Sequence, residues 1–265
     1  MQIRQFFILF LSFLILMSCD PVQKILKSEN PAYKVAAADK YFERGKYSQA
    51  AQIYEDVLKY FRGSQQAEDV YYRMAYSHFK EGQNGLSQIE FKNFLESYPL
   101  SLKTEDALYY YAQTLVNQSP QVDLDQSPTE LAISGLLLFV DRFPESSHIE
   151  EINKTIDRLR VKVETREYNN SLIYYKILNY RGAVYALRNY LIDYPGSKNR
   201  EYVEYLIVKS NYEYAENSVN AKKNERYNNT IQAYIEFEER FPSSSYLIEA
   251  KKVKELAQAR LLELK

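Results

Sequence analysis

The sequence predicts an all-α protein, an α-solenoid of five stacked helical hairpins followed by a C-terminal closing helix. Three observations favour this class. A short motif recurs five times, apolar residues upstream of each copy share one helical face, and glycine (7) and proline (8) make only 15 of 265 residues. A β-sandwich or barrel needs a turn every ~8–12 residues, so this scarcity of turn-forming residues argues against one.

The recurring motif is an aromatic residue with a serine three positions later. Its five copies are Phe61-Arg-Gly-Ser64, Tyr98-Pro-Leu-Ser101, Phe143-Pro-Glu-Ser146, Tyr194-Pro-Gly-Ser197 and Phe241-Pro-Ser-Ser244. Proline follows the aromatic residue in all copies except the first, which has Arg62. Proline cannot continue a helix and biases the residue before it away from the helical conformation, so each motif is expected to follow the end of a helix.

Upstream of each aromatic residue the chain repeats a packing pattern. A small residue stands eleven positions before it, a large apolar residue seven before it, and another four before it, and these offsets fall on one face of a helix. The small residues are Ala50, Ser87, Ala132, Ala183 and Thr230. The large residues are Tyr54, Phe91, Leu136, Leu187 and Tyr234, followed by Val57, Phe94, Phe139, Tyr190 and Phe237.

This pattern resembles the second helix of a tetratricopeptide repeat (TPR), a helix–turn–helix unit of ~34 residues. Ala38 and Ala75 supply the small residue expected in the first helices, and Gly45 and Gly82 fall where the turns are expected. The closing helix is expected at about residues 245–264.

The N-terminus carries a targeting signal. Arg4 is followed by an apolar run, Phe6–Met17, which is typical of a secretory signal peptide and too short to span a membrane, since that takes ~20 residues. Leu16-Met17-Ser18-Cys19 resembles a lipobox, which implies cleavage before the only cysteine and its lipidation. We therefore expect a lipoprotein signal peptide at 1–18, a lipid-anchored tether at 19–31 and the TPR solenoid at 32–265. The alternative is a plain signal peptide with an incidental cysteine.

Composition excludes several functions. The formal net charge of −1 excludes broad electrostatic binding to nucleic acid. One cysteine and two histidines argue against a structural zinc site, and no metal or cofactor is expected. No nucleophile with an adjacent base stands out, so we expect no enzyme. His78 falls at a packing position and is expected to lie in the core.

The segment Glu145–Arg181 contains no glycine or proline. Its apolar residues step by three and four, which predicts a helix of ~30 residues. The sequence leaves open whether the segment forms one helix or two, and whether it packs as core or is exposed to a partner.

Stacked hairpins offer a groove lined by their first helices. By TPR position, the groove of the second and third hairpins is lined by Tyr72, Arg73, Tyr76, Lys80, Tyr109 and Tyr110. In the first hairpin the same positions hold Val35, Asp39 and Glu43, and Asp69 joins them in the second. Tyrosines with one or two cations suit an extended peptide with aromatic side chains and a carboxylate. The alternative is that the tyrosines pack between repeats.

A lipobox, a short tether and five TPR-like hairpins together resemble the BamD family, lipoproteins of the β-barrel assembly (BAM) machinery of Gram-negative bacteria. The strongest local likeness is Lys59–Tyr76, and a second covers Tyr174–Ala183. The resemblance implies a non-enzymatic lipoprotein on the periplasmic face of the outer membrane, held there by its lipid anchor only, which helps to insert β-barrel proteins.

The resemblance also implies partners. The C-terminal repeats, about 146–265, would bind the barrel-forming BamA subunit through its periplasmic domains, and the N-terminal repeats, about 32–145, would engage unfolded outer-membrane proteins. For BamA we expect the exposed charges Arg181, Arg188 and Arg200 to contribute. Whether other BAM lipoproteins attach is left open. Two alternatives remain: another periplasmic TPR scaffold for cell-envelope or division complexes, and a nutrient-binding TPR lipoprotein, although the latter often uses Trp, which is absent here.

Overall fold

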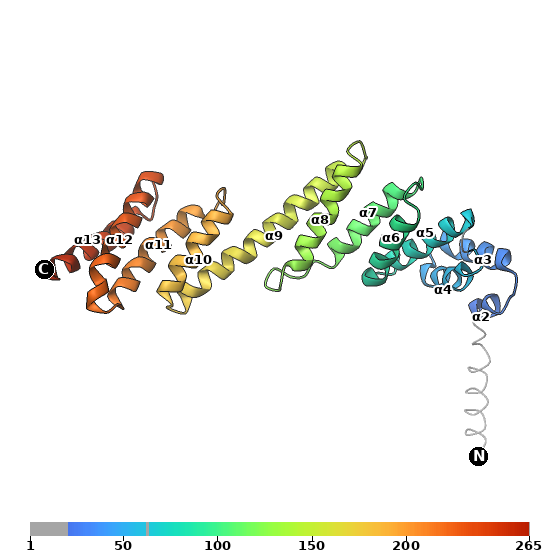
Figure 1. Ribbon diagram of the computed structural model, residues 1–265, viewed down its shortest axis with the longest axis horizontal. Coiled ribbons are helices and arrows are strands. Elements are labelled where there is room, and N and C mark those ends of the chain that lie inside the picture. Colours follow the sequence, from blue (N-terminus) through green and yellow to red (C-terminus); the bar gives the residue numbers. More distant parts are fainter. Residues whose placement is uncertain (1–20, 62–63, 265) are drawn as a thin grey trace, which may run out of the picture. The chain divides into compact units, whose positions relative to one another are not determined.

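The computed structural model describes residues 21–61 and 64–264, and within them it contains twelve helices and no strand. Ten of these helices pair into five consecutive hairpins (Figure 1). The hairpins are α3 (Pro31–Glu43) with α4 (Tyr47–Leu58), α5 (Gln65–Lys80) with α6 (Asn84–Ser97), α7 (Thr104–Asn117) with α8 (Ser127–Arg142), α9 (Ile149–Lys176) with α10 (Tyr180–Asp193), and α11 (Arg200–Glu216) with α12 (Asn220–Arg240). The closing helix is α13 (Leu247–Glu263). The predicted all-α class is confirmed.

The chain divides into two compact units inside α9. The first holds the described residues up to Gln121 together with Asp125–Asp157, and the second holds Val122–Leu124 and the residues from Arg158 on. In the first unit each helix from α3 to α8 packs against the next along the chain. In the second unit α10 to α13 do the same. The functional division that we expect near residue 145 stays a prediction.

The repeating pattern read from the sequence is the packing pattern of the hairpins. The five small residues of the second helices are all fully buried, and none of the ten large residues of the same pattern is more than 3% exposed. Small side chains allow close approach of the helices. In the second hairpin, for example, the Ser87 Oγ donates to the carbonyl oxygen of Ala75, in the facing helix, at 3.1 Å.

Proline ends the second helices as predicted. The residue before each of these prolines caps its helix with φ between −123° and −132° and ψ between 59° and 67°, outside the helical region. Each cap still donates its backbone N–H to the carbonyl four residues earlier. The caps are Tyr98, Phe143, Tyr194 and Phe241. The first copy, which lacks proline, differs: α4 ends at Leu58, three residues before the aromatic residue of its motif, whereas the other four helices end directly before theirs.

The segment 145–181 contains one long helix and the start of a second. α9 runs for 28 residues, the chain turns at 177–179, and α10 begins at Tyr180. At this turn Leu178 adopts φ +61°, where the first two hairpins have Gly45 at +69° and Gly82 at +73°. Ile152, Ile156 and Leu159 of α9 are at most 3% exposed, so this face of the helix is core.

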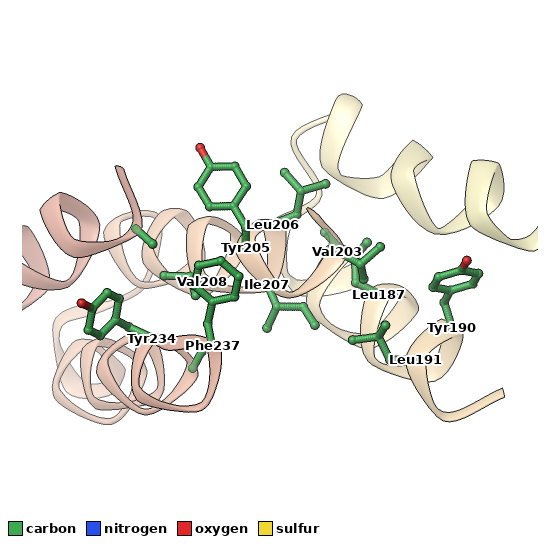
Figure 2. Close-up of a cluster of buried hydrophobic side chains, with 13 residues drawn as sticks. Leu187, Tyr190, Leu191, Val203, Tyr205, Leu206, Ile207, Val208, Tyr234 and Phe237 are labelled. Carbon is green, nitrogen blue, oxygen red and sulfur yellow. The ribbon is translucent and has the colours of Figure 1, made fainter. Parts of the chain in front are cut away.

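The second unit is built around α11. Six consecutive residues of this helix, 203–208, are buried, which is typical of a helix enclosed on most sides. Figure 2 shows Leu187 and Leu191 of α10 on one side of α11, with Tyr234 and Phe237 of α12 on another, while Ile207 extends between these two groups. This cluster joins three successive helices into one core.

The expected signal peptide and Cys19 lie outside the described residues. The later part of the expected tether forms the short helix α2 (Pro21–Leu26), which the sequence reading did not anticipate. Val22 and Ile25 of α2 are buried in the core of the first hairpin, so these residues are part of the folded unit.

Candidate functional site

The predicted groove tyrosines of α5 and α7 form a connected aromatic cluster. The Tyr76 ring lies 4.9 Å from Tyr110, 5.5 Å from Phe42 and 6.3 Å from Tyr72, measured between ring centroids. Tyr110 also stacks on the buried ring of Phe91 at 5.9 Å. Burial raises the pKa of Tyr72 and of Tyr110 above the ordinary value of 10, so both hydroxyls stay protonated even in moderately alkaline solution. These rings fill the space between hairpins and also present partly exposed edges.

Tyr109 and Lys80 lie at the two ends of this cluster. Tyr109 stacks on His148 with centroids 4.0 Å apart and donates from its hydroxyl to Glu151 at 3.3 Å, so it joins α7 to the start of α9. The Lys80 Nζ lies 5.9 Å from the centre of the Tyr76 ring and 5.8 Å from that of Tyr47. Cations over aromatic faces are attracted by the ring quadrupole.

Arg73 lies next to a hollow of about 310 Å³ between α3 and α5, the first helices of the first two hairpins. The size is at the lower end for small-molecule sites, ~300–1,000 Å³. Apolar side chains and three charged groups line it together with two polar ones. The lining residues are Ala32, Val35, Ala36, Asp39, Tyr54, Phe61, Gln66, Asp69, Val70 and Arg73.

The charges of the hollow are organised around Asp39. Its Oδ1 accepts the Tyr54 hydroxyl at 2.6 Å and the Arg73 Nη1 at 3.0 Å. Burial, and then the neighbouring Asp39 carboxylate, raise the pKa of Tyr54, which keeps that hydroxyl a donor. The Arg73 guanidinium also lies 5.5 Å from the centre of the Phe42 ring. A guanidinium has five N–H donors, so Arg73 retains donors for a carboxylate.

Sequence reasoning found part of this hollow. Val35, Asp39, Asp69 and Arg73 were placed on the groove by their TPR positions, and all four line it. Tyr54 is buried in the core as its spacing predicts, but its hydroxyl also reaches Asp39 at the hollow, which the spacing does not indicate. The spacing of apolar residues predicts which aromatic rings lie in the core, but it does not predict the direction of a tyrosine hydroxyl group. The remaining groove tyrosines lie in the adjacent cluster and do not line this hollow.

The predicted partner-binding arginines lie in the second unit. Arg188 lines a hollow of about 200 Å³ between α10, α11 and α12. Glu204 also lines this hollow and is only 6% exposed. Its carboxylate accepts hydrogen bonds from Arg200 Nε, at 2.9 Å, and from Arg240. Arg181 is exposed at the start of α10 and does not line this hollow. The spacing of four residues between Arg200 and Glu204 is enough to predict an ion pair on one face of a helix. Nothing in the sequence predicts the second pair, because Arg240 stands 36 positions after Glu204.

His78 is a core residue, as expected. Its Nδ1 lies 2.7 Å from Glu90 Oε2, and both residues are 7% exposed.

The described residues contain no group of three His, Cys, Asp or Glu side chains placed to hold a metal ion. Among the described helices, none has the length and apolar character needed to cross a membrane.

Comparison with known families identifies the chain. The family model described as YfiO, outer membrane lipoprotein, matches residues 27–176 and 171–263, which span nearly all of the folded chain. A comparison with curated proteins gives no match. The YfiO model is the family domain of BamD-type lipoproteins, so the family expected from the lipobox and the hairpins is confirmed. The chain belongs to the YfiO family of outer membrane lipoproteins.

Proposed function

We propose that this outer membrane lipoprotein acts on the periplasmic face, where it helps to assemble and insert β-barrel proteins. It binds the barrel-forming BamA subunit with its second unit and receives unfolded barrel proteins with its first. The family match over both units carries this proposal, together with the position of Arg73 between a hollow and a partly exposed aromatic cluster. We propose that it does so as a binding protein and performs no catalysis.

The substrate side of the proposal rests on chemistry. An unfolded barrel protein presents extended apolar strands and typically ends in an aromatic residue with a free carboxylate. The hollow beside Arg73 has apolar walls, Val35 and Val70 among them, and a guanidinium that can bind a carboxylate in a bidentate manner. The neighbouring rings of Tyr72 and Tyr76 offer rigid, amphipathic contact area for the preceding residues.

The partner side rests on the second hollow. Arg200 and Arg240 share the buried carboxylate of Glu204, and Arg188 and the exposed Glu236 line the same hollow, so these three arginines and two glutamates carry a net charge of +1. The exposed Ile192 adds apolar area beside these charges. Arginine is enriched among the residues that contribute most to protein–protein binding. An acidic segment of a periplasmic BamA domain is the partner that fits this surface.

An affinity pull-down from detergent-solubilised outer membranes tests the function. Recovery of a large β-barrel protein with soluble N-terminal domains is the expected result. The variant Arg188→Glu, which reverses a charge without touching the Glu204 pair, should reduce recovery, and the matched variant Arg142→Glu in the first unit should not. Recovery of division or peptidoglycan proteins, or of a nutrient transporter, without a barrel-assembly subunit would contradict the proposal and favour one of the two alternatives.

A further inference from the structure

A further hollow, of about 240 Å³, lies between α2 and α3 at the N-terminal end of the first unit. Its floor is apolar, with Ile25 and Ala37 both buried. Lys40, in the last turn of α3, and Arg44, which caps the end of this helix, stand four residues apart at its rim. Two tyrosines complete the wall. The lining residues are Ile25, Tyr33, Ala36, Ala37, Lys40, Tyr41 and Arg44.

The segment that carries this hollow is basic in a chain that is slightly acidic. Residues 21–46 contain six basic and three acidic side chains, a net charge of +3, whereas the whole chain has −1. Two of these charges are neutralised inside the fold, since Lys34 pairs with Asp56 and Asp39 pairs with Arg73. The remaining acids, Glu29 and Glu43, are exposed.

The cations at the surface of this segment are unpaired. Lys24, Lys27, Lys40 and Arg44 are all exposed, and none of them forms an ion pair with any residue that the structure describes. Each therefore keeps its charge for a ligand outside the chain. A phosphate group is the ligand that suits an Arg fork beside a Lys point charge.

The position of the hollow in the chain indicates where that phosphate comes from. α2 begins at Pro21, two residues after Cys19. Two extended residues span at most ~7 Å, which is within one Debye length, ~8 Å, at physiological salt. An acyl anchor on Cys19 therefore holds α2 at the lipid headgroups, and the buried Ile25 fixes α3 beside α2.

We propose that the hollow between α2 and α3 binds the headgroup of an anionic phospholipid in the membrane leaflet that holds the lipid anchor. Lys40 and Arg44 bind the phosphate, and Tyr33 and Tyr41 lie at the interface with their amphipathic rings. Lys24 and Lys27 add attraction to the same surface. This second attachment point restricts the orientation of the first unit on the membrane. The proposal rests on the lipid anchor of the proposed function.

The absence of tryptophan from the chain makes a direct test possible. Tyr33→Trp, the hollow probe, places a single tryptophan at the hollow, and Tyr185→Trp, the distant probe, places one at an exposed site in the second unit. Each acylated full-length protein is reconstituted into vesicles of phosphatidylcholine alone, or of phosphatidylcholine with phosphatidylglycerol in equal parts. Both kinds of vesicle carry a lipid with a nitroxide quencher on its headgroup.

The expected result is strong quenching of the hollow probe that requires phosphatidylglycerol, with weak quenching of the distant probe. Each basic residue near an anionic membrane strengthens binding about fivefold, so Lys40→Gln with Arg44→Gln should weaken docking about 25-fold. The quenching of the hollow probe should then fall to its level in vesicles of phosphatidylcholine alone. The charge-matched pair Lys251→Gln and Lys252→Gln, both exposed on α13, should leave it unchanged. A thermal melt checks that each variant is folded.

Three results would overturn the proposal. Equal quenching of the two probes would mean that the chain collects at the surface without using the hollow. Quenching of the hollow probe that persists without phosphatidylglycerol would exclude recognition of an anionic headgroup. Loss of quenching on addition of soluble glycerol phosphate would identify the hollow as a site for a free phosphate compound. Acyl labelling of the same samples distinguishes failure of the lipid anchor from failure of the headgroup site. A protein without the acyl label contradicts the anchor. A labelled protein whose hollow probe is not quenched contradicts only the headgroup site.

Discussion

Asp39 determines how Arg73 can act. The carboxylate accepts from both Tyr54 and Arg73, so it fixes the guanidinium at the edge of the hollow without using all of its donors. An arginine held in this way loses little conformational freedom when a carboxylate binds. Such pairing between residues 34 positions apart has no signature in the sequence. The TPR register could place both side chains on one face, but only the fold brings them to 3.0 Å.

Truncation of Arg73 should weaken peptide binding without unfolding the protein. A residue that contributes strongly to an interface typically costs ~2 kcal/mol or more when truncated, so Arg73→Ala should lower the affinity for a peptide with the C-terminal sequence of a barrel protein about 30-fold. Fluorescence titration with a labelled peptide measures this. Arg142→Ala, which removes an exposed arginine of the same unit, is the control and should bind as wild type. Unchanged affinity in Arg73→Ala, with a normal melt, would place the substrate site elsewhere.

The small residues of the second helices should not tolerate enlargement. Ala50 and Ala183 are fully buried at helix contacts, and added methylenes in a packed site cost ~1–3 kcal/mol. Ala50→Leu and Ala183→Leu should therefore each lower the free energy of unfolding by ~1–3 kcal/mol, as measured by denaturant titration. Ala259→Leu, at an exposed position of α13, should have little effect. Equal stability of all three variants would refute the packing role of these positions.

At the scale of the helices, the ends before proline were predictable and the turns only in part. Proline acts locally on the residue before it, so Tyr98 and Phe143 cap their helices where the sequence places them. Gly45 and Gly82 marked two turns because they accept positive φ at no steric cost. Leu178 adopts the same conformation against its own preference, so nothing in the sequence distinguished the turn after α9 from a continuing helix. That is why the segment 145–181 could not be divided in advance.

Substitutions at these turns should separate backbone strain from packing. A Cβ added at Gly82 or at Gly85 would meet no atom within 4 Å, but only Gly82 has positive φ. Gly82→Ala should therefore lower the free energy of unfolding by ~1 kcal/mol. Gly85→Ala, inside α6, should raise it by ~0.5 kcal/mol. Leu178→Gly should raise the free energy of unfolding by ~1 kcal/mol, because glycine accepts the positive φ at this position without strain. The leucine side chain is 68% exposed, so its removal loses little buried area. Urea titrations measure all three, and a stabilising Gly82→Ala would contradict this account.

At the scale of the whole molecule, the sequence predicted the succession of hairpins and the family but not where the chain divides. The packing pattern recurs in each hairpin, so it gives the number and order of hairpins. The division lies within α9, a continuous helix with no break in its own pattern. Likewise α2 could not be predicted, because its six residues make fewer than two turns, too few for apolar residues to repeat at helical spacing. Its stability comes from burying Val22 and Ile25.

The 26 tyrosines should make the fold sensitive to alkaline pH. Burial raises the pKa of Tyr234 and of Tyr205 to about 12, from an ordinary value of 10. Unfolded tyrosines lose their protons near pH 10 and the buried ones do not, so stability is complete below pH 10 and falls as the pH rises towards 12. Phenolate absorbance should follow two phases, the second coinciding with loss of helical circular dichroism, and Tyr234→Phe should make the fall in stability less steep. Ionisation of all tyrosines in one phase, with the helices intact, would contradict the prediction.

Attachment to the membrane should depend on Cys19 more than on any part of the folded chain. Each buried CH₂ of an acyl chain contributes ~0.8 kcal/mol, and more than one chain gives a stable anchor, whereas cations near an anionic surface contribute only about 1 kcal/mol each. Cys19→Ala should therefore abolish acyl labelling and release the protein from membrane pellets washed with high salt, while Lys40→Gln with Arg44→Gln should leave the acylated protein in the pellet. The wash screens the attraction between Lys or Arg and lipid, so it separates acyl anchoring from headgroup binding. An unlabelled Cys19→Ala protein that stays with washed vesicles lacking any partner protein would show that the folded residues themselves anchor the chain.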